Sequence, residues 1–242
     1  QAGTYVLSKN MSIKQIVEEL CEGNPPKATV KFTIPEGYTV AGIAKVLLEK
    51  GLITSETQLF DAAKTGDAFQ SFAFISAAAA TEHAESRAYL LEGYLFPDTY
   101  EVYADASVET ILIKMLNRFN DVFSEEYLTR AQELGMTMDQ VVTLASLIER
   151  EAQAPDDFAK VSAVFHNRLD QDMPLQSCAS LSYVLGMTKY TFTDAERETD
   201  SLYNTYKFNG LPVGPVSNPG KAAIEAALYP NETFVSEGYL YF

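Results

Sequence analysis

Glu149 lies on the apolar face of a predicted helix, where its carboxyl group would be largely buried. The helix is expected to begin near Met138, because Thr137 and Gln140 match a capping box, and to end before Pro155. At about 100° per residue, one face of this helix collects apolar side chains around the glutamate, namely Val141, Val142, Ala145, Ile148 and Ala152. A carboxylate on such a face needs an explanation, because burying an unpaired charge is costly.

Two interpretations of the buried Glu149 are open from the residues alone. A buried glutamate most often pairs with an arginine or a helix N-terminus, and Arg168 is the best cationic candidate. Alternatively, burial raises the pKa of the carboxyl group and makes it a general acid. Residues 203–220, YNTYKFNGLPVGPVSNPG, favour the second interpretation, because their amide groups and aromatic rings suit a sugar. We therefore expect Glu149 to line the largest cleft of its part of the chain, with a raised pKa.

Other chemistries have less support in the sequence. Cys21 and Cys178 form no CxxC motif, and we expect two unpaired thiols, with a single disulfide as the alternative. With only His83 and His166 available, we expect no His/Cys metal site and no cofactor. The GxSxG turn of a serine nucleophile is absent from the sequence.

The composition predicts a folded globular protein and narrows its partners. Of 242 residues, 47% are hydrophobic and 12% aromatic, which excludes a disordered chain. The net charge of -15 argues against nucleic acid and against an anionic membrane surface, since both attract lysine and arginine. The sequence holds no run of about 18 apolar residues, which argues against a transmembrane span or a signal peptide. It opens at QAGTYVLSKN without an initiator methionine, so we expect a trimmed or processed product.

Patterning divides the chain into a first region at about 1–88 and a second at about 89–242. The first region predicts a strand in GTYVLSKN, an amphipathic helix from Ile13 that stops at Gly23, an alternating strand, and a second helix that runs through Leu48. The alternating strand carries Val30, Phe32 and Ile34. The weakly patterned, Ala-rich segment at about 65–88 is predicted to be a short helix and a linker.

The second region is predicted to be mostly helical. Its expected helices cover about 107–122, 125–134, 138–153, 157–169, 179–186 and 219–229. For the last helix, Asn218 is the expected N-cap and Pro219 the first helical residue. Residues 203–220 are long and irregular, which is typical of a binding loop. The final GYLYF is predicted to be a strand, so the fold class is α+β.

Six motifs in one order are similar to a known family. LEGYLFPDTYEV, LASLIEREA, VFHNRLDQDMPLQS, YNTY, GLPVGPVSNPG and YLYF together resemble the MltG (YceG-like) family of endolytic murein transglycosylases. IPEGYTVAGIAKVL in the first region resembles the LysM-like module that precedes the catalytic domain in that family. The resemblance implies a small LysM-like module followed by a mainly helical catalytic domain with a few short strands.

The resemblance also implies an activity. The implied reaction cleaves the β-1,4 bond between N-acetylmuramic acid and N-acetylglucosamine without water. The muramic acid 6-hydroxyl attacks the anomeric carbon, and the product carries a 1,6-anhydro end. The implied partners are peptidoglycan glycan strands and the cell-wall synthesis machinery. The implied location is the extracytoplasmic face of the bacterial membrane, with a single-pass anchor ahead of the first region that this chain lacks.

Site residues follow from the matching motifs. Glu149 becomes the single general acid and base, whereas Glu151, about 200° around the helix, cannot share its pocket position and is expected to have a supporting or surface role. The expected substrate-binding residues are Gln176, Tyr203, Asn204, Tyr206 and Asn218. For Gln176, Asn204 and Tyr206, hydrogen bonds that only stabilise the loop are the alternative. Supporting roles are also expected for Arg168 and Glu92, although Glu92 and Asp98 are more typical of backbone capping or arginine pairing.

The sequence departs from the family pattern where LQSCAS stands in place of LQSDPT. Cys178 replaces an acid and Ala179 a proline, and the chain ends at YLYF where the family continues with a His-containing segment. Two rival functions remain. A two-carboxylate hydrolase would take its second acid from Glu92, Asp98 or Glu151. A wall-binding module without catalysis would gain nothing from a carboxyl group on an apolar face.

Overall fold

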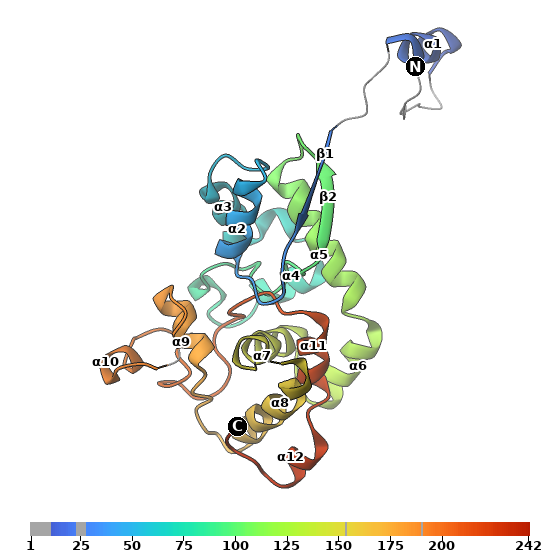
Figure 1. Ribbon diagram of the computed structural model, residues 1–242. Helices are drawn as coiled ribbons and strands as arrows, with labels where there is room; N and C mark the ends of the chain where they lie inside the picture. The colour runs from blue at the N-terminus through green and yellow to red at the C-terminus, as the bar shows by residue number, and fades with distance from the viewer. Residues whose placement is uncertain (1–10, 23–27, 153, 190) are drawn as a thin grey trace.

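The protein is mainly helical, with one small antiparallel sheet in the part that the structure describes. The computed structural model describes residues 11–22, 28–152, 154–189 and 191–242. Strand β1 (Thr29–Thr33) pairs with β2 (Thr99–Tyr103), with Thr29 opposite Tyr103 and Thr33 opposite Thr99 (Figure 1). Side chains alternate between faces along a strand, and this brings the rings of Phe32 and Tyr100 to a centroid distance of 5.6 Å. The predicted strand around Val30 and Phe32 is confirmed.

Within its described residues, 11–22 and 28–88, the first region contains four helices in addition to β1. They are α1 (Ile13–Glu22), α2 (Val40–Glu49), α3 (Glu56–Thr65) and α4 (Ala73–Ala79). The predicted opening strand and the predicted stop at Gly23 lie outside the described residues. The Ala-rich segment holds α4 and two 3-10 turns, at Asp67–Phe69 and Ala84–Ser86. Phe69, Phe74 and Ile75 are buried there, so this segment packs against the rest of the protein.

The second region contains β2 and eight helices within the described ranges. The helices are α5 (Val108–Val122), α6 (Glu125–Glu133), α7 (Met138–Glu151), α8 (Pro155–Asp170), α9 (Cys178–Leu185), α10 (Asp194–Arg197), α11 (Lys221–Leu228) and α12 (Glu232–Ser236). Six of these were predicted, to within two residues at most ends. None of the helices described here is long and apolar enough to cross a membrane.

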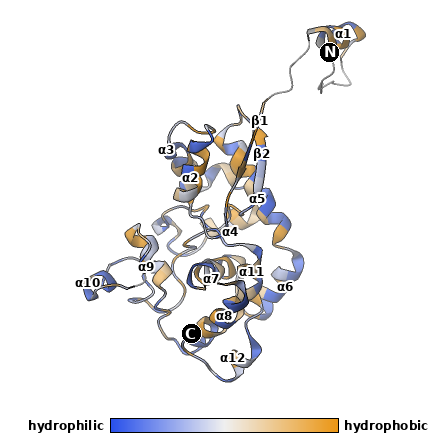
Figure 2. Ribbon diagram, in the orientation of Figure 1, coloured by the Kyte–Doolittle hydropathy of each residue, from blue (hydrophilic) through white to orange (hydrophobic). Residues whose placement is uncertain are grey.

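Helix α7 forms the centre of the second region. The predicted capping box is present, because Thr137 accepts from Gln140 N and the Gln140 side chain accepts from Thr137 N. Every residue from Val141 to Ile148 is buried. Helices α8, α9 and α11 pack against α7, and Figure 1 shows it enclosed by them. In the ribbon coloured by hydropathy, hydrophobic and hydrophilic residues alternate along these helices (Figure 2).

Two predictions about the end of the chain are wrong. Residues 238–242 form no strand, because side chains of α8 bind their carbonyl groups: Asn167 Nδ2 donates to Tyr239 O and Arg168 Nε to Leu240 O. Helix α11 begins after Gly220, so Asn218 is not its N-cap. The Asn218 side chain is instead used to hold another loop, as described below.

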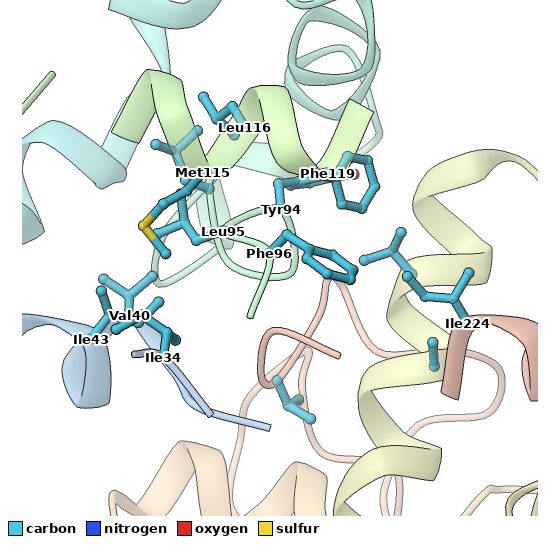
Figure 3. Close-up of a cluster of buried hydrophobic side chains, with 14 of the residues drawn as sticks. Ile34, Val40, Ile43, Tyr94, Leu95, Phe96, Met115, Leu116, Phe119 and Ile224 are labelled. Carbon is cyan, nitrogen blue, oxygen red and sulfur yellow. The ribbon is translucent and has the colours of Figure 1, made fainter. Parts of the chain in front are cut away.

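Most of the buried hydrophobic side chains that the structure describes form one cluster, which includes residues on both sides of residue 88. Figure 3 shows Ile34 and Ile43 near Leu95 and Met115, with Ile224 in the same close-up. Such continuity counts against two separately packed cores. The boundary near residue 88 and the LysM-like character of the first region stay predictions.

Candidate functional site

Glu149 lines an open pocket of about 340 Å³ at the C-terminal end of α7. The turn after β1, the end of α7, the start of α9 and residues 188–189 supply its walls. The lining residues are Glu36, Gly37, Tyr38, Glu149, Arg150, Glu151, Cys178, Ala179, Ser182, Thr188 and Lys189. The pocket is therefore built from both regions of the chain.

The surroundings of the Glu149 carboxyl group raise its pKa. Burial is the main cause of its raised pKa, and the nearby charge of Glu36 raises it further, whereas a hydrogen bond from Gly220 N and the charge of Arg150 oppose the shift. Gly220 N donates to Oε2 at 3.0 Å. Among the described residues, no cationic side chain pairs with Glu149 within 4.0 Å.

The predicted alternative, an ion pair between Glu149 and Arg168, is wrong. Arg168 Nε donates to Leu240 O, and its Nη1 donates to Pro174 O and Leu175 O. Its guanidinium group also lies over the Tyr241 ring, 4.9 Å from the centroid. Arg168 therefore holds the end of the chain and the segment before α9 in place.

A Pro-Glu-Gly turn brings Glu36 close to the Gly220–Glu149 hydrogen bond. Gly220 has no room for a side chain, because an added Cβ would lie 2.0 Å from Glu36 Oε1. Gly37 has a φ of 73°, which favours glycine, and an added Cβ would lie 3.3 Å from Glu149 Cγ. Glu36 was not among the predicted site residues. The sequence signal that could have indicated it is the IPEGYTV motif, which contains it.

Glu151 lines the same pocket as Glu149, so the expectation that it could not share this position is wrong. The pocket surrounds the last turn of α7. Side chains that point in different directions from this turn therefore line the same cavity. Glu151 Oε1 accepts from Ser177 Oγ at 2.5 Å and from Ala179 N at 2.9 Å. Glu151 thereby holds the N-terminus of α9, which agrees with its expected supporting role.

Asn204 and Tyr203 bind the protein backbone. Asn204 Nδ2 donates to Arg197 O and Thr199 O, while its Oδ1 accepts from Tyr206 N. The Tyr203 hydroxyl accepts from Ala88 N. Both side chains are buried and neither lines the Glu149 pocket. The contacts of Asn204 are those of the alternative role, in which its hydrogen bonds stabilise the loop.

Asn218 also holds backbone together. Its Oδ1 accepts from Gly93 N and Leu95 N, and its Nδ2 donates to Tyr38 O and to Glu92 Oε1. The side chain is completely buried, and all its polar atoms have partners in the protein. Asn218 thus fixes the loop that enters α11 and does not line the Glu149 pocket.

Tyr206 reaches the pocket only through Cys178, and Gln176 stays outside it. The Tyr206 hydroxyl lies 3.2 Å from Cys178 Sγ, and Cys178 lines the pocket. Burial, together with Cys178, raises the pKa of Tyr206. Gln176 is exposed, with a φ of 51° and its Oε1 3.5 Å from Arg168 Nη1. The predicted site is therefore only partly assembled around Glu149.

Glu92 caps the N-terminus of α2 from the protein interior. Backbone capping is one of the roles that the sequence favoured for this residue. Glu92 accepts from Val40 N at the start of α2, from Asn218 Nδ2 at 2.7 Å and from the Tyr183 hydroxyl at 3.1 Å. Desolvation raises the pKa of Glu92 to about 8 despite these hydrogen bonds. Asp98, the other acid of that motif, pairs with Arg118 Nε at 2.6 Å.

Glu92 lines a second pocket, of about 410 Å³, that adjoins the first. Arg150, Ala179, Ser182 and Thr188 line both, so the two form one groove. A third cavity, of about 720 Å³, lies beside His166 and Phe208. Glu149 therefore does not line the largest cleft, contrary to the prediction.

Together these features define an α+β protein with a partly buried carboxyl group of raised pKa, Glu149, in an open groove. The chain belongs to the YceG-like family, which residues 1–242 match. It is 34% identical over 272 residues to the endolytic murein transglycosylase of Streptococcus pneumoniae strain D39, with 100% of this chain and 48% of that protein covered.

Two further relatives agree with this assignment. The endolytic murein transglycosylase of Bacillus subtilis strain 168 is 34% identical over 258 residues, and 66% of its length is covered. The crystal structure of a YceG-like protein from Listeria monocytogenes has a TM-score of 0.75 and 37% identity, covering 98% of this chain and 77% of the other. This chain spans about half the length of the streptococcal relative.

Proposed function

We propose that this chain is the catalytic part of a lytic transglycosylase that cuts peptidoglycan strands internally. The bond cleaved is the β-1,4 bond between N-acetylmuramic acid and N-acetylglucosamine, and the product carries a 1,6-anhydro end. The observation that carries the proposal is the Glu149 carboxyl group, which lines the groove, has a pKa raised by burial and forms no ion pair within the described chain. The names of the relatives support the choice of substrate.

One carboxyl group suffices for this reaction. Protonated Glu149 gives its proton to the leaving glycosidic oxygen, and the resulting carboxylate then takes the proton from the muramic acid 6-hydroxyl. That hydroxyl closes onto the anomeric carbon, so no water molecule and no second carboxylate is needed. The Gly220 N–H fixes Oε2 of Glu149 and stabilises its ionised form midway through the reaction.

A hydrolase is the second candidate, and the position of Glu36 favours it. A glycosidase that uses water needs two carboxyl groups beside the bond, and Glu36 lines the Glu149 pocket from its exposed side. The acids considered from the sequence suit this role less well. Glu92 is buried, Asp98 pairs with Arg118, and Glu151 holds the start of α9.

The products of digestion distinguish the candidates. Purified glycan strands are incubated with the protein, and the new ends are identified by mass spectrometry. Anhydro ends are the expected result, and the protein without added strands is the blank. Reducing ends would establish the hydrolase, and strands that stay intact would leave a wall-binding module.

The same proposal gives the protein a location. Murein lies outside the bacterial membrane, so we place the activity at the extracytoplasmic face, with an anchor preceding the first region. Cell-wall synthesis proteins are the proposed protein partners. Fractionation of cells and co-purification of the membrane-bound full-length protein would test both points, and recovery from the cytoplasm alone would contradict them.

A further inference from the structure

Three cations line the groove beside Glu149, namely Lys45, Arg150 and Lys189. Arg150 borders both pockets, because it follows Glu149 at the end of α7, and Lys45 on α2 borders the second pocket. Both side chains belong to exposed residues. A ligand that extends from the Glu149 pocket into the second pocket would therefore pass Arg150 first and then reach the pocket wall that carries Lys45.

Neither Lys45 nor Arg150 is neutralised by the described part of the protein. No carboxylate there lies within 4.0 Å of Lys45 or Arg150, and the hydrogen bond of Arg150 goes to a carbonyl group, Gly37 O, at 3.3 Å. By contrast, Lys189 in the same groove pairs with Glu196 at 2.6 Å.

The acid of the second pocket forms no ion pair with these two unpaired cations. Glu92 is 1% exposed, and burial raises its pKa to about 8 although the charge of Arg150 opposes the shift, so its ionised form is disfavoured. The first pocket differs, because three acids, Glu36, Glu149 and Glu151, line it together with Arg150 and Lys189. Acids thus outnumber cations where the bond would be cut, and cations outnumber acids in the second pocket, which Lys45, Arg150 and Glu92 line.

From this arrangement we propose that Lys45 and Arg150 form a carboxylate-binding subsite for the acidic side arm of muramic acid. The inference rests on the function proposed above and adds a specificity to it. Each muramic acid carries a lactyl group that ends in a carboxylate or in a peptide with its own carboxylates. Arginine binds a carboxylate through two parallel hydrogen bonds and lysine adds a point charge. Binding this arm would position the neighbouring glycosidic bond at Glu149.

Substrate charge provides the test. Wild type, Lys45→Gln and Lys45→Arg are compared on native glycan strands and on strands whose carboxyl groups have been amidated. The measured quantity is the ratio of kcat/KM for native strands to kcat/KM for amidated strands. We expect wild type to prefer native strands, Lys45→Gln to lower the ratio roughly tenfold, and Lys45→Arg to restore most of it.

Lys50, the C-cap residue of α2, provides the matched control. Its side chain is exposed and lines neither pocket, so Lys50→Gln removes the same charge and should leave the ratio at its wild-type value. Strands stripped of peptide distinguish the two sources of the carboxylate. An effect of Lys45→Gln that persists on them assigns the lactyl carboxylate, and one that disappears assigns the peptide.

Two results would overturn the subsite. One is a wild-type ratio near one, and the other is a Lys45→Gln ratio equal to that of Lys50→Gln. Both can be observed only if wild type cleaves the strands. Absence of cleavage of every strand type would instead contradict the proposed function, so the two failures are distinguishable.

Discussion

Glu149 differs from the other carboxyl groups of the groove in what its oxygens contact. Glu92 and Glu151 each accept hydrogen bonds from a helix N-terminus and from a side-chain hydroxyl. Glu149 accepts one backbone hydrogen bond, from Gly220 N. Since hydrogen bonds to the ionised form lower a carboxyl pKa and burial raises it, Glu149 combines a raised pKa with access to a pocket.

At the same scale, Glu36 is predicted to tune this acid. Its charge raises the pKa of Glu149, so Glu36→Gln should lower that pKa. The proton-donating form is then lost at lower pH, and the alkaline limb of the kcat/KM profile moves to lower pH. A pH–rate profile of wild type and Glu36→Gln measures the displacement.

The opposite outcome for Glu36 is equally informative. If Glu36→Gln abolishes cleavage at every pH, Glu36 acts as a second catalytic carboxylate and the hydrolase replaces the transglycosylase. Lys31→Gln is the control, because Lys31 is exposed on β1 and lines neither pocket of the groove. Its profile should match that of wild type.

At the scale of elements, acids hold the helices that meet at the groove. Glu92 accepts from the first backbone N–H of α2, and Glu151 accepts from Ala179 N near the start of α9. Negative groups stabilise helix N-termini, because the unpaired N–H groups carry partial positive charge. The ends of α2, α7 and α9 are thus fixed relative to one another, and the groove walls with them.

Removal of the α9 cap is predicted to lower the stability of the fold more than the rate of the reaction. Glu151→Ala loses both acceptor contacts and should cost about 1 kcal/mol of unfolding free energy, as N-cap losses typically do. Glu151→Gln keeps an acceptor oxygen and should cost less. Urea unfolding measures both, and KM should rise more than kcat falls. A loss of kcat in Glu151→Gln comparable to that in Glu149→Gln would contradict the assignment.

At the scale of the whole molecule, the sequence predicted elements with strong local signals. The capping box at Thr137 and Gln140 predicted the start of α7, and helical periodicity placed Glu149 among buried residues. Strand β2 was missed, although Tyr100 and Val102 alternate with exposed residues. Its partner β1 lies some 70 positions earlier along the chain, and short strands gain their stability from such distant pairing.

The site was predicted in part for a related reason. Periodicity identified Glu149, but Glu36 reaches it from a turn more than 100 residues earlier in the sequence. The amide groups of Asn204 and Asn218 can form the same kinds of hydrogen bond with a sugar or with the loop backbone. Only the positions of their backbone partners decide between these roles. Local patterns carry no information about such contacts.

Glu92 links the groove to the stability of the whole protein. Its pKa is raised to about 8 from an ordinary value of 4.5, so the folded state binds more protons than the unfolded state between these values. Stability should therefore be greatest below pH 4.5 with respect to this group and fall as the pH rises through 8. In Glu92→Gln, the amide oxygen can take the place of Oε1 and accept from Val40 N and Asn218 Nδ2.

The predicted consequence is a weaker pH dependence in the variant. Unfolding free energies from urea titrations at pH 5 and pH 8.5 should decrease more in wild type than in Glu92→Gln. The comparison at two pH values cancels any constant cost of the substitution. An equal decrease in both proteins would show that Glu92 is not the buried acid responsible.

The measurement that tests the central claim most directly is the rate of anhydro-end formation by Glu149→Gln. Glutamine keeps the volume and can still accept from Gly220 N, but it cannot donate an acidic proton. Loss of general acid catalysis typically removes roughly 10²–10⁴-fold in rate, and because Glu149 serves both proton transfers, we expect the upper end of this range. The thermal midpoint should stay at or slightly above that of wild type, since a desolvated carboxyl group is removed. Near-normal formation of anhydro ends by a folded Glu149→Gln protein would contradict the account.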